Sequence, residues 1–250
     1  MQTRYTSSAE SAWFNTPASG VADDTRAAGH ISGWNAITKR VFRRTLVCAA
    51  MMALGTGSLP ITSTKVPSAL AAFEHAWKGV TAYSATITIF ERKGSQTQNM
   101  AFDYRFSKPS NLAIRVVAGA NKGATLVWDG GRTVVVKRGS GFLSLFRRTV
   151  SLDDPIVATI RGSTVDQLSF GAIIAHSRQA GTLSEKRGDV INGVATEAVV
   201  LIPAHPSADA NLTREVIEIS TTTHFPLRIL GYAGPTLVRK IDIADAHFMH

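Results

Sequence analysis

The chain has 250 residues, of which 44% are apolar and 18% charged, and its formal net charge is +9. It is too apolar for a disordered protein, and it lacks the several long hydrophobic spans of a polytopic membrane protein. Its single cysteine, Cys48, excludes a disulfide framework and a cysteine-rich zinc site.

The N-terminal part of the sequence predicts an extension followed by an export signal. Residues 1–38 are rich in Ala, Ser, Thr and Gly without a hydrophobic period, which is typical of a disordered extension or of a misassigned start. Residues 39–71 have the order of a secretory signal: a basic patch at 39–44, an apolar stretch at 46–54 and small residues ending in Ala69-Leu70-Ala71. The apolar stretch is shorter than the ~20 residues that span a bilayer. We therefore predict cleavage between residues 59 and 73 and a periplasmic location, with an inner-membrane signal anchor as the alternative.

Residues 72–250 are expected to form one domain that opens with a helix and continues with strands. Leu70, Phe73, Trp77 and Val80 recur at helical spacing. Alternating apolar residues then predict strands at 85–91, 101–106, 112–117, 126–128 and 133–137, and Asp129-Gly130 predicts a tight hairpin between the last two.

The second half repeats this order of helix and strands. A helix is predicted from Thr164 to Arg178, because Thr164 and Gln167 have capping-box spacing, while Gly171 weakens its interior. Further strands are predicted at 194–202, 214–220, 226–232 and 237–243. The fold class is therefore mainly antiparallel β (α+β), and a sheet of nine or more strands tends to curl or close.

The domain carries no recognisable catalytic or nucleic-acid-binding pattern. Residues 73–250 hold 20 basic and 15 acidic residues, and their densest clusters, Lys137-Arg138 and Arg147-Arg148, are interpreted as solvated strand ends. Nucleophile-elbow, zinc-protease, phosphate-loop and dinucleotide motifs are absent from the sequence. Asp153-Asp154 is interpreted as a turn, and the terminal pair His247 and His250 as incidental. We expect a protein that is not an enzyme and that uses no metal, cofactor or nucleic acid.

Four phrases, in this order, resemble the LolA-like periplasmic lipoprotein carrier superfamily over nearly all of residues 70–250. They are the helix-to-strand phrase from Phe73 to Ala85, the turn Arg105-Phe106-Ser107-Lys108-Pro109-Ser110-Asn111-Leu112, the hairpin Leu126-Val127-Trp128-Asp129-Gly130, and Phe225-Pro226-Leu227-Arg228. The resemblance implies an incomplete, strongly curved barrel of about nine to eleven strands, with helices covering the open side. It also implies a hollow that holds acyl chains. In the carrier an arginine that matters to cargo handling stands in the turn, where this chain has Lys108; lysine keeps the charge but loses the planar donor fork.

Several strands are apolar on both faces, which requires helices, a second sheet or a ligand to cover them. The candidates for lining a hydrophobic cavity are Phe90, Phe102, Tyr104, Phe106, Leu112, Ile114 and Trp128. Which alternation faces inward stays open, since a one-residue shift turns every side chain over. A lid helix would pack through Leu168, Phe170 and Ile174, or the same residues would simply be core. The resemblance implies a monomeric carrier of a lipid or an acylated protein, with membrane-bound donor and acceptor proteins as possible partners; the alternative is a periplasmic sensor that binds a membrane partner in envelope-stress signalling.

Overall fold

The computed structural model describes residues 66–138, 147–206 and 211–250. The expected extension at 1–38 and the export signal up to residue 65 lie outside the described residues. The first helix, α1 (Ser68–Gly79), follows from the predicted apolar stripe: Leu70 and Phe73 are buried and Trp77 is half-buried against the core. Helix α1 begins at Ser68, so the small residues Ala69-Leu70-Ala71, which end the predicted export signal, lie within its first turn.

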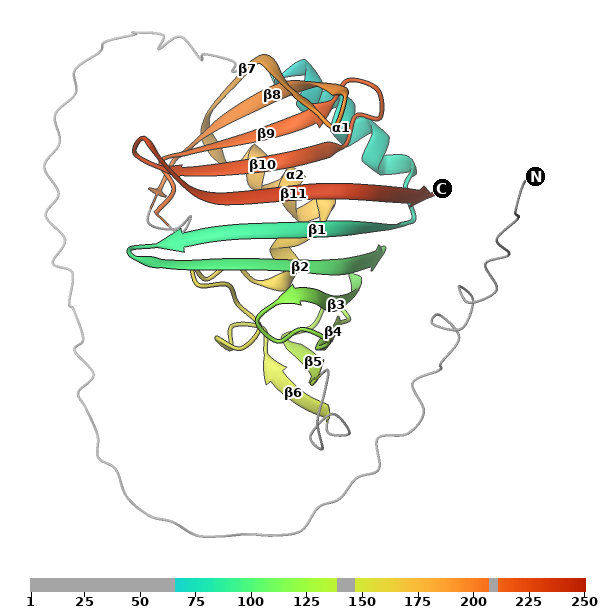
Figure 1. Ribbon diagram of the computed structural model, residues 1–250. Coiled ribbons are helices and arrows are strands. Elements are labelled where there is room, and N and C mark those ends of the chain that lie inside the picture. Colours follow the sequence, from blue (N-terminus) through green and yellow to red (C-terminus); the bar gives the residue numbers. More distant parts are fainter. Residues whose placement is uncertain (1–65, 139–146, 207–210) are drawn as a thin grey trace, which may run out of the picture. The chain divides into compact units, whose positions relative to one another are not determined.

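Eleven antiparallel strands form a single curved sheet with the order β6-β5-β4-β3-β2-β1-β11-β10-β9-β8-β7 (Figure 1). The first six are β1 (Ala82–Lys93), β2 (Gln96–Ser107), β3 (Asn111–Gly119), β4 (Thr125–Trp128), β5 (Thr133–Lys137) and β6 (Arg147–Ser151). The others are β7 (Ala180–Ile191), β8 (Val194–Pro203), β9 (Arg214–Ser220), β10 (Pro226–Ala233) and β11 (Thr236–Met249). The pairing of β1 with β11 joins two meanders, and within the described residues no pairing joins β6 to β7. The predicted open, curved antiparallel sheet is thus confirmed.

Two of these strands, β6 and β7, were not among the predicted ones. β6 has only five residues, starts with two arginines and is mostly exposed. β7 contains Gly181, Gly188 and a run of charged residues, so its own sequence has little strand preference. Pairing with β5 and with β8 makes both segments strands.

The sheet register identifies the face that carries the core. Ile87 pairs with Phe102 and Ala85 with Tyr104, and Tyr104 pairs in turn with Ile114. All of these side chains are buried, whereas alternate residues on the same strands point to the other face. Both helices lie against this inner face (Figure 1), and they cover it as the family resemblance implies.

The predicted helix from Thr164 to Arg178 is divided into two pieces. A 3₁₀ turn, η2 (Val165–Leu168), precedes α2 (Phe170–Arg178), and Ser169 between them has an extended backbone. Each piece has its own start: Gln167 Oε1 accepts the backbone N–H of Thr164 at 3.3 Å, and Ser169 Oγ accepts that of Ala172 at 3.1 Å. The serine begins a second helix because its hydroxyl satisfies one of the free donors at a helix start.

Candidate functional site

A pocket opens at the rim of the covered face, where the end of α1, the β2–β3 turn and the start of α2 meet. Its volume is about 620 Å³. It is lined by Trp77, Phe106, Lys108, Pro109, Ser169, Gly171 and Ala172. Apolar walls with a single ammonium group are the composition expected of a site for an amphiphile.

Lys108 is held at the edge of this pocket by the C-terminal end of α1. Its ammonium donates to the carbonyl oxygens of Trp77 at 2.7 Å and Lys78 at 3.4 Å, and it lies 4.2 Å from the centre of the Trp77 ring. Desolvation lowers the pKa of Lys108. A cation at this place satisfies carbonyls that the helix leaves free and complements the negative end of its dipole. The peptide bond from Lys108 to Pro109 is cis.

Gly171 brings the two helices together on the opposite side of the pocket. A Cβ atom at this position would lie 3.4 Å from Trp77 Nε1, so the start of α2 packs directly on the indole. Gly171 thus lies in the first turn of α2, at the contact between the two helices, with room for a methyl group.

Beneath the pocket, the inner face of the sheet is filled by aromatic side chains around Phe170. Its ring stacks on Tyr83, with centroids 4.4 Å apart, and on Phe225 at 5.4 Å; its backbone N–H donates to the Tyr83 hydroxyl. Phe73 and Trp77 meet Phe170 edge-on. Such pairs stabilise by about 0.5–1.5 kcal/mol each beyond their buried area. Helix α2 is consequently an integral part of the core in this structure.

The structure brings most of the predicted cavity residues together. Phe102, Tyr104, Phe106, Leu112 and Ile114 are buried side by side on the inner face, and Trp128 packs at its margin. Phe90 lies on the other face, half-buried, with the guanidinium of Arg92 5.8 Å from its ring centre. Of the three helix residues, Phe170 is buried and Leu168 and Ile174 are partly buried against the core.

Three aromatic residues that complete the cluster, Tyr83, Phe225 and Phe248, were not among the predicted site residues. Tyr83 continues the alternation of Ala85 and Ile87 toward the N-terminus of β1, so a longer reading of that strand would have included it. Phe248 lies on β11 beyond the predicted strand end, and its ring stacks on Phe225 with centroids 3.9 Å apart.

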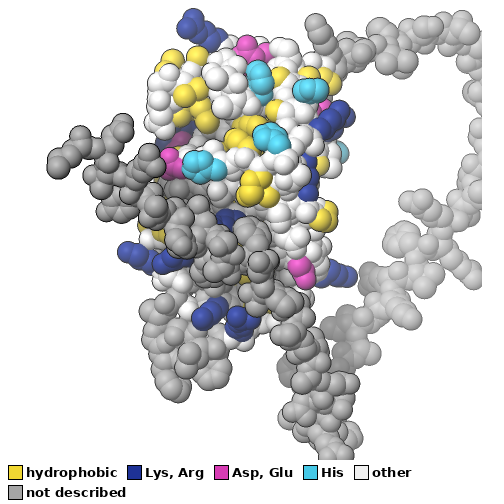
Figure 2. All heavy atoms as spheres, turned by 90° about the vertical axis from the view of Figure 1, so that its right-hand side faces the viewer, with side chains coloured by type: hydrophobic (Ala, Val, Ile, Leu, Met, Phe, Trp, Pro, Cys, Tyr) yellow, Lys and Arg dark blue, Asp and Glu magenta, His cyan; other side chains and the backbone are white. Residues whose placement is uncertain are grey.

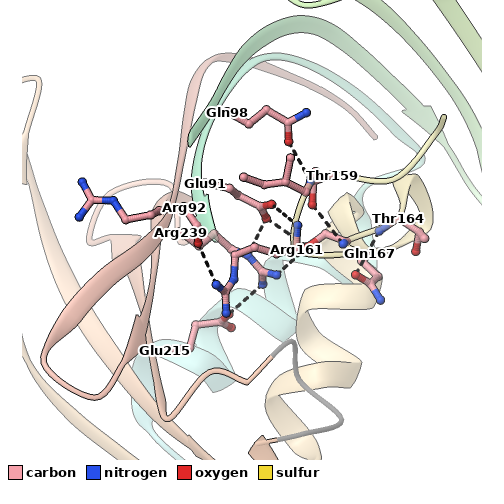
Figure 3. A network of polar contacts seen from close by, with 11 residues as sticks. Glu91, Arg92, Gln98, Thr159, Arg161, Thr164, Gln167, Glu215 and Arg239 are labelled. Carbon is pink, nitrogen blue, oxygen red and sulfur yellow. Dashed lines mark hydrogen bonds and ion pairs between the residues drawn. The ribbon is translucent and has the colours of Figure 1, made fainter. Parts of the chain in front are cut away.

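A second buried site, a network of charged side chains, lies between the segment before η2 and the inner face of the sheet (Figure 3). Glu91, only 1% exposed, accepts hydrogen bonds from Arg239 Nε at 3.1 Å, from the backbone of Arg161 at 3.1 Å and from the Ser163 hydroxyl at 3.3 Å. Arg239 also donates to Ser163 at 2.6 Å and lies 3.7 Å from Glu215. The network ties the chain that leads into the helices to β1, β9 and β11.

The same segment has two further attachments to the first two strands. The backbone N–H of Ile160 donates to Gln98 Oε1 at 3.0 Å, and Arg161 Nη1 donates to the carbonyl of Arg92 at 2.8 Å. From α2 itself, His176 Nε2 lies 3.4 Å from Glu215 Oε1. One signal in the sequence pointed here: Glu91 follows Ile87 and Ile89 at strand spacing, which places an acid on a buried face, where it requires partners.

Among the residues that the structure describes, no group of three or more His, Cys, Asp or Glu is arranged to hold a metal ion. Within the same residues, none of the helices has the length and hydrophobicity needed to traverse a membrane.

No family model and no curated protein sequence matches this chain. Solved structures do match it. Lipoprotein LppX from Mycobacterium tuberculosis matches with a TM-score of 0.44 and 14% identity, over 72% of this chain and 95% of that one. A LolA superfamily protein from Nitrosomonas europaea matches with a TM-score of 0.33 and 12% identity, over 74% and 95%. MucB of Pseudomonas aeruginosa, solved in complex with MucA, matches with a TM-score of 0.38 and 12% identity, over 74% of this chain and 58% of that one.

Proposed function

We propose that this protein binds an acyl chain of a lipid or of an acylated protein, and that the chain enters at the rim pocket beside Lys108. The observation that carries the proposal is the composition of that pocket, in which Trp77 and Phe106 provide apolar walls and Lys108 provides the cation. An acyl chain gains about 0.8 kcal/mol for each methylene that it buries. The ammonium is placed to attract a polar or anionic headgroup that stays at the mouth.

Two walls of the rim pocket, Trp77 and Phe106, belong to the aromatic cluster, and a long acyl chain would need more room than the pocket offers. We propose that α2 is the lid. Displacing Phe170 would uncover Tyr83 and Phe225 and, behind them, the predicted cavity residues on β2 and β3. The ligand would then replace aromatic contacts that the empty protein makes with itself, which permits both uptake and release.

The pocket can be tested by filling it. Ala172→Trp adds an indole to the pocket wall, and Ala175→Trp adds the same side chain at an exposed position of the same helix. With dansyl-undecanoic acid as the probe, we expect Ala172→Trp to weaken binding at least tenfold and Ala175→Trp to leave it within about twofold of the unchanged protein. If both folded variants bind the probe as the unchanged protein does, the rim pocket is not the site, and binding of a membrane protein partner becomes the better reading.

We also propose that the protein is exported to the periplasm and that its mature N-terminus lies between residues 59 and 67. Leu70 is fully buried, and Ser68 and Ala69 both donate to Glu185, so cleavage at 69–72 would remove the first turn of α1 together with these contacts. N-terminal sequencing of the protein from a periplasmic fraction tests this. Intact residues 1–40 on a cytoplasmic protein would contradict export.

A further inference from the structure

The charges of the domain are divided unevenly between its two halves. Residues 104–152, from the end of β2 to the start of the helical region, contain nine Lys or Arg and one acidic residue, Asp129. Residues 153–250 contain eight basic and eleven acidic residues. The half of the sheet that ends in β6 is therefore strongly positive, while the half that ends in β7 is slightly negative.

The sheet register aligns part of this positive charge in one row. Arg115 on β3 pairs with Thr125, Thr125 with Lys137 on β5, and Lys137 with Arg147 on the edge strand β6. All three basic residues are exposed and lie on the outer face, opposite the core. Like charges directly opposite each other destabilise a sheet. Lys137 and Arg147 are such a pair, so folding alone does not favour this part of the row.

Three more basic residues, Lys122, Arg138 and Arg148, are exposed at the same end of these strands. We call the six residues Arg115, Lys122, Lys137, Arg138, Arg147 and Arg148 the basic edge. Among the described residues none of the six forms an ion pair with an acidic side chain within 4.0 Å, although Asp103 on β2 is the register partner of Arg115. Figure 2 shows Lys and Arg side chains at the lower end of the molecule, where Figure 1 places β4 to β6.

An exposed apolar pair lies beside the row. Val127 and Val135 face each other across β4 and β5, and their exposed fractions are 52% and 36%. Val127 stands two residues after Thr125 on β4, and Val135 stands two residues before Lys137 on β5. Both valines therefore lie on the outer face of the sheet, beside the row. Apolar side chains beside cations match a bilayer surface, where anionic headgroups lie next to acyl chains.

We propose that the basic edge, together with Val127 and Val135, docks this protein on the surface of an anionic lipid bilayer. A single-stranded nucleic acid fits less well, because such sites use aromatic side chains as stacking platforms and the described outer residues of β3 to β6 include none. The proposal depends on the charge and register of β3 to β6 and not on the rim pocket. It would nevertheless bring an acyl-chain binder to the surface where its ligand resides.

The test measures binding of the full chain to vesicles of phosphatidylcholine alone and of phosphatidylcholine with about a third phosphatidylglycerol. Each Lys or Arg near an anionic surface strengthens binding roughly fivefold. The variant Arg115→Gln/Lys137→Gln/Arg147→Gln, called the row variant, removes the three charges of the row. It should therefore weaken binding to the anionic vesicles on the order of 100-fold at low salt. The matched control, Lys93→Gln/Lys186→Gln/Arg187→Gln, removes three exposed cations elsewhere and should change binding less than fivefold. The basic patch at 39–44 and the apolar stretch at 46–54 are present in every variant, so the contribution of this segment is the same in the variant and in its control.

A second variant separates a bilayer from a soluble polyanion. Val127→Thr/Val135→Thr keeps β-branched side chains and all charges; it should weaken binding to the anionic vesicles severalfold and leave binding to heparin unchanged. Equal loss of vesicle binding in the row variant and its control would overturn the proposal. So would a row variant that loses heparin binding while its vesicle binding is unchanged, because the surface would then be a site for a soluble polyanion.

Discussion

The ammonium of Lys108 and the ring of Trp77 form a cation–π pair at 4.2 Å, and the same ammonium donates to the Trp77 carbonyl at 2.7 Å. One side chain from the β2–β3 turn therefore fixes both the backbone and the indole of the last turn of α1. This pair links the turn that resembles the carrier family to the wall of the rim pocket. It gives Lys108 a structural role in the ligand-free protein, in addition to the proposed role toward a headgroup.

Lys108→Met should lower the free energy of unfolding by about 1 kcal/mol, because it removes a helix C-terminal cation and a cation–π contact. Urea denaturation followed by circular dichroism measures the change. Lys93→Met, which removes an exposed lysine at the end of β1, serves as the control and should stay within about 0.5 kcal/mol of the unchanged protein. A loss of the same size in both variants would argue against the contact with α1.

Gly171→Ala should stabilise the protein by up to about 1 kcal/mol, since alanine is the better helix former. The new Cβ would meet Trp77 Nε1 at 3.4 Å, an ordinary contact distance. Gly231→Ala is the instructive comparison, because its Cβ would lie 3.1 Å from carbon atoms of Arg239 and Leu212 and should destabilise. If thermal unfolding shows Gly171→Ala to be less stable than the unchanged protein, the added methyl group clashes with Trp77 and the packing of α2 on the indole cannot relax to admit it.

The features that could be predicted from the sequence are those carried by local periodicity. The stripe of Leu70 and Phe73 predicts α1, and the alternation of Phe102, Tyr104 and Phe106 predicts a strand with one buried face. The face to which Phe90 belongs could not be predicted, because on β1 it is a large apolar residue next to the alternation of Ile87 and Ile89, and a one-residue shift turns every side chain over. The pairing of Ile87 with Phe102 resolves this, and it excludes Phe90 from the inner face.

The features that escaped prediction depend on contacts between distant parts of the chain. β7 is a strand because β8 pairs with it, despite two glycines and a charged run. Ser169 divides the predicted helix because the chain must leave η2 and place Phe170 between Tyr83 and Phe225. The partners of Glu91 come from residues about 70 and 148 positions away, a separation that no local pattern reveals.

The buried network predicts a large effect for Arg239. Arg239→Met should destabilise the protein by about 3–5 kcal/mol, because it leaves the Glu91 carboxylate buried without its cation. Combining it with Glu91→Gln should restore part of this loss, since the Glu91 charge is then removed; the recovery stays incomplete because Glu215, also buried, has lost Arg239 as well. The control is Arg178→Met, which breaks the exposed pair with Glu74 and should cost far less than Arg239→Met, because solvent screens the exposed guanidinium. Additive losses in the double variant would show that the two side chains do not interact.

The N-terminus of α1 is held by Glu185 on β7, which accepts hydrogen bonds from Ser68 Oγ at 2.8 Å and from the backbone of Ala69 at 3.3 Å. Although desolvation raises the pKa of Glu185, these hydrogen bonds outweigh it, and the net pKa is lowered. Glu197 on β8 lies beside it. The hydrogen bond with Glu185, desolvation and the repulsion between the two carboxyls raise the pKa of Glu197. One carboxyl therefore ionises readily while its neighbour resists ionisation.

The two carboxyls should respond to the same substitution with opposite signs. A lowered pKa in the folded state means that Glu185 stabilises above its ordinary pKa and loses this effect as the pH falls, so Glu185→Gln should destabilise at pH 7. A raised pKa means that Glu197 destabilises once it is ionised, so Glu197→Gln should stabilise at pH 7 by ~0.2–1 kcal/mol, the range of exposed ionic interactions. The gain should shrink as the pH falls below the raised pKa of Glu197 and vanish below the ordinary glutamate pKa, because both the folded and the unfolded chain are then protonated there. Melting temperatures of both variants between pH 3 and pH 8 test this, and a gain from Glu197→Gln that persists at pH 3 would show that it does not arise from the charge.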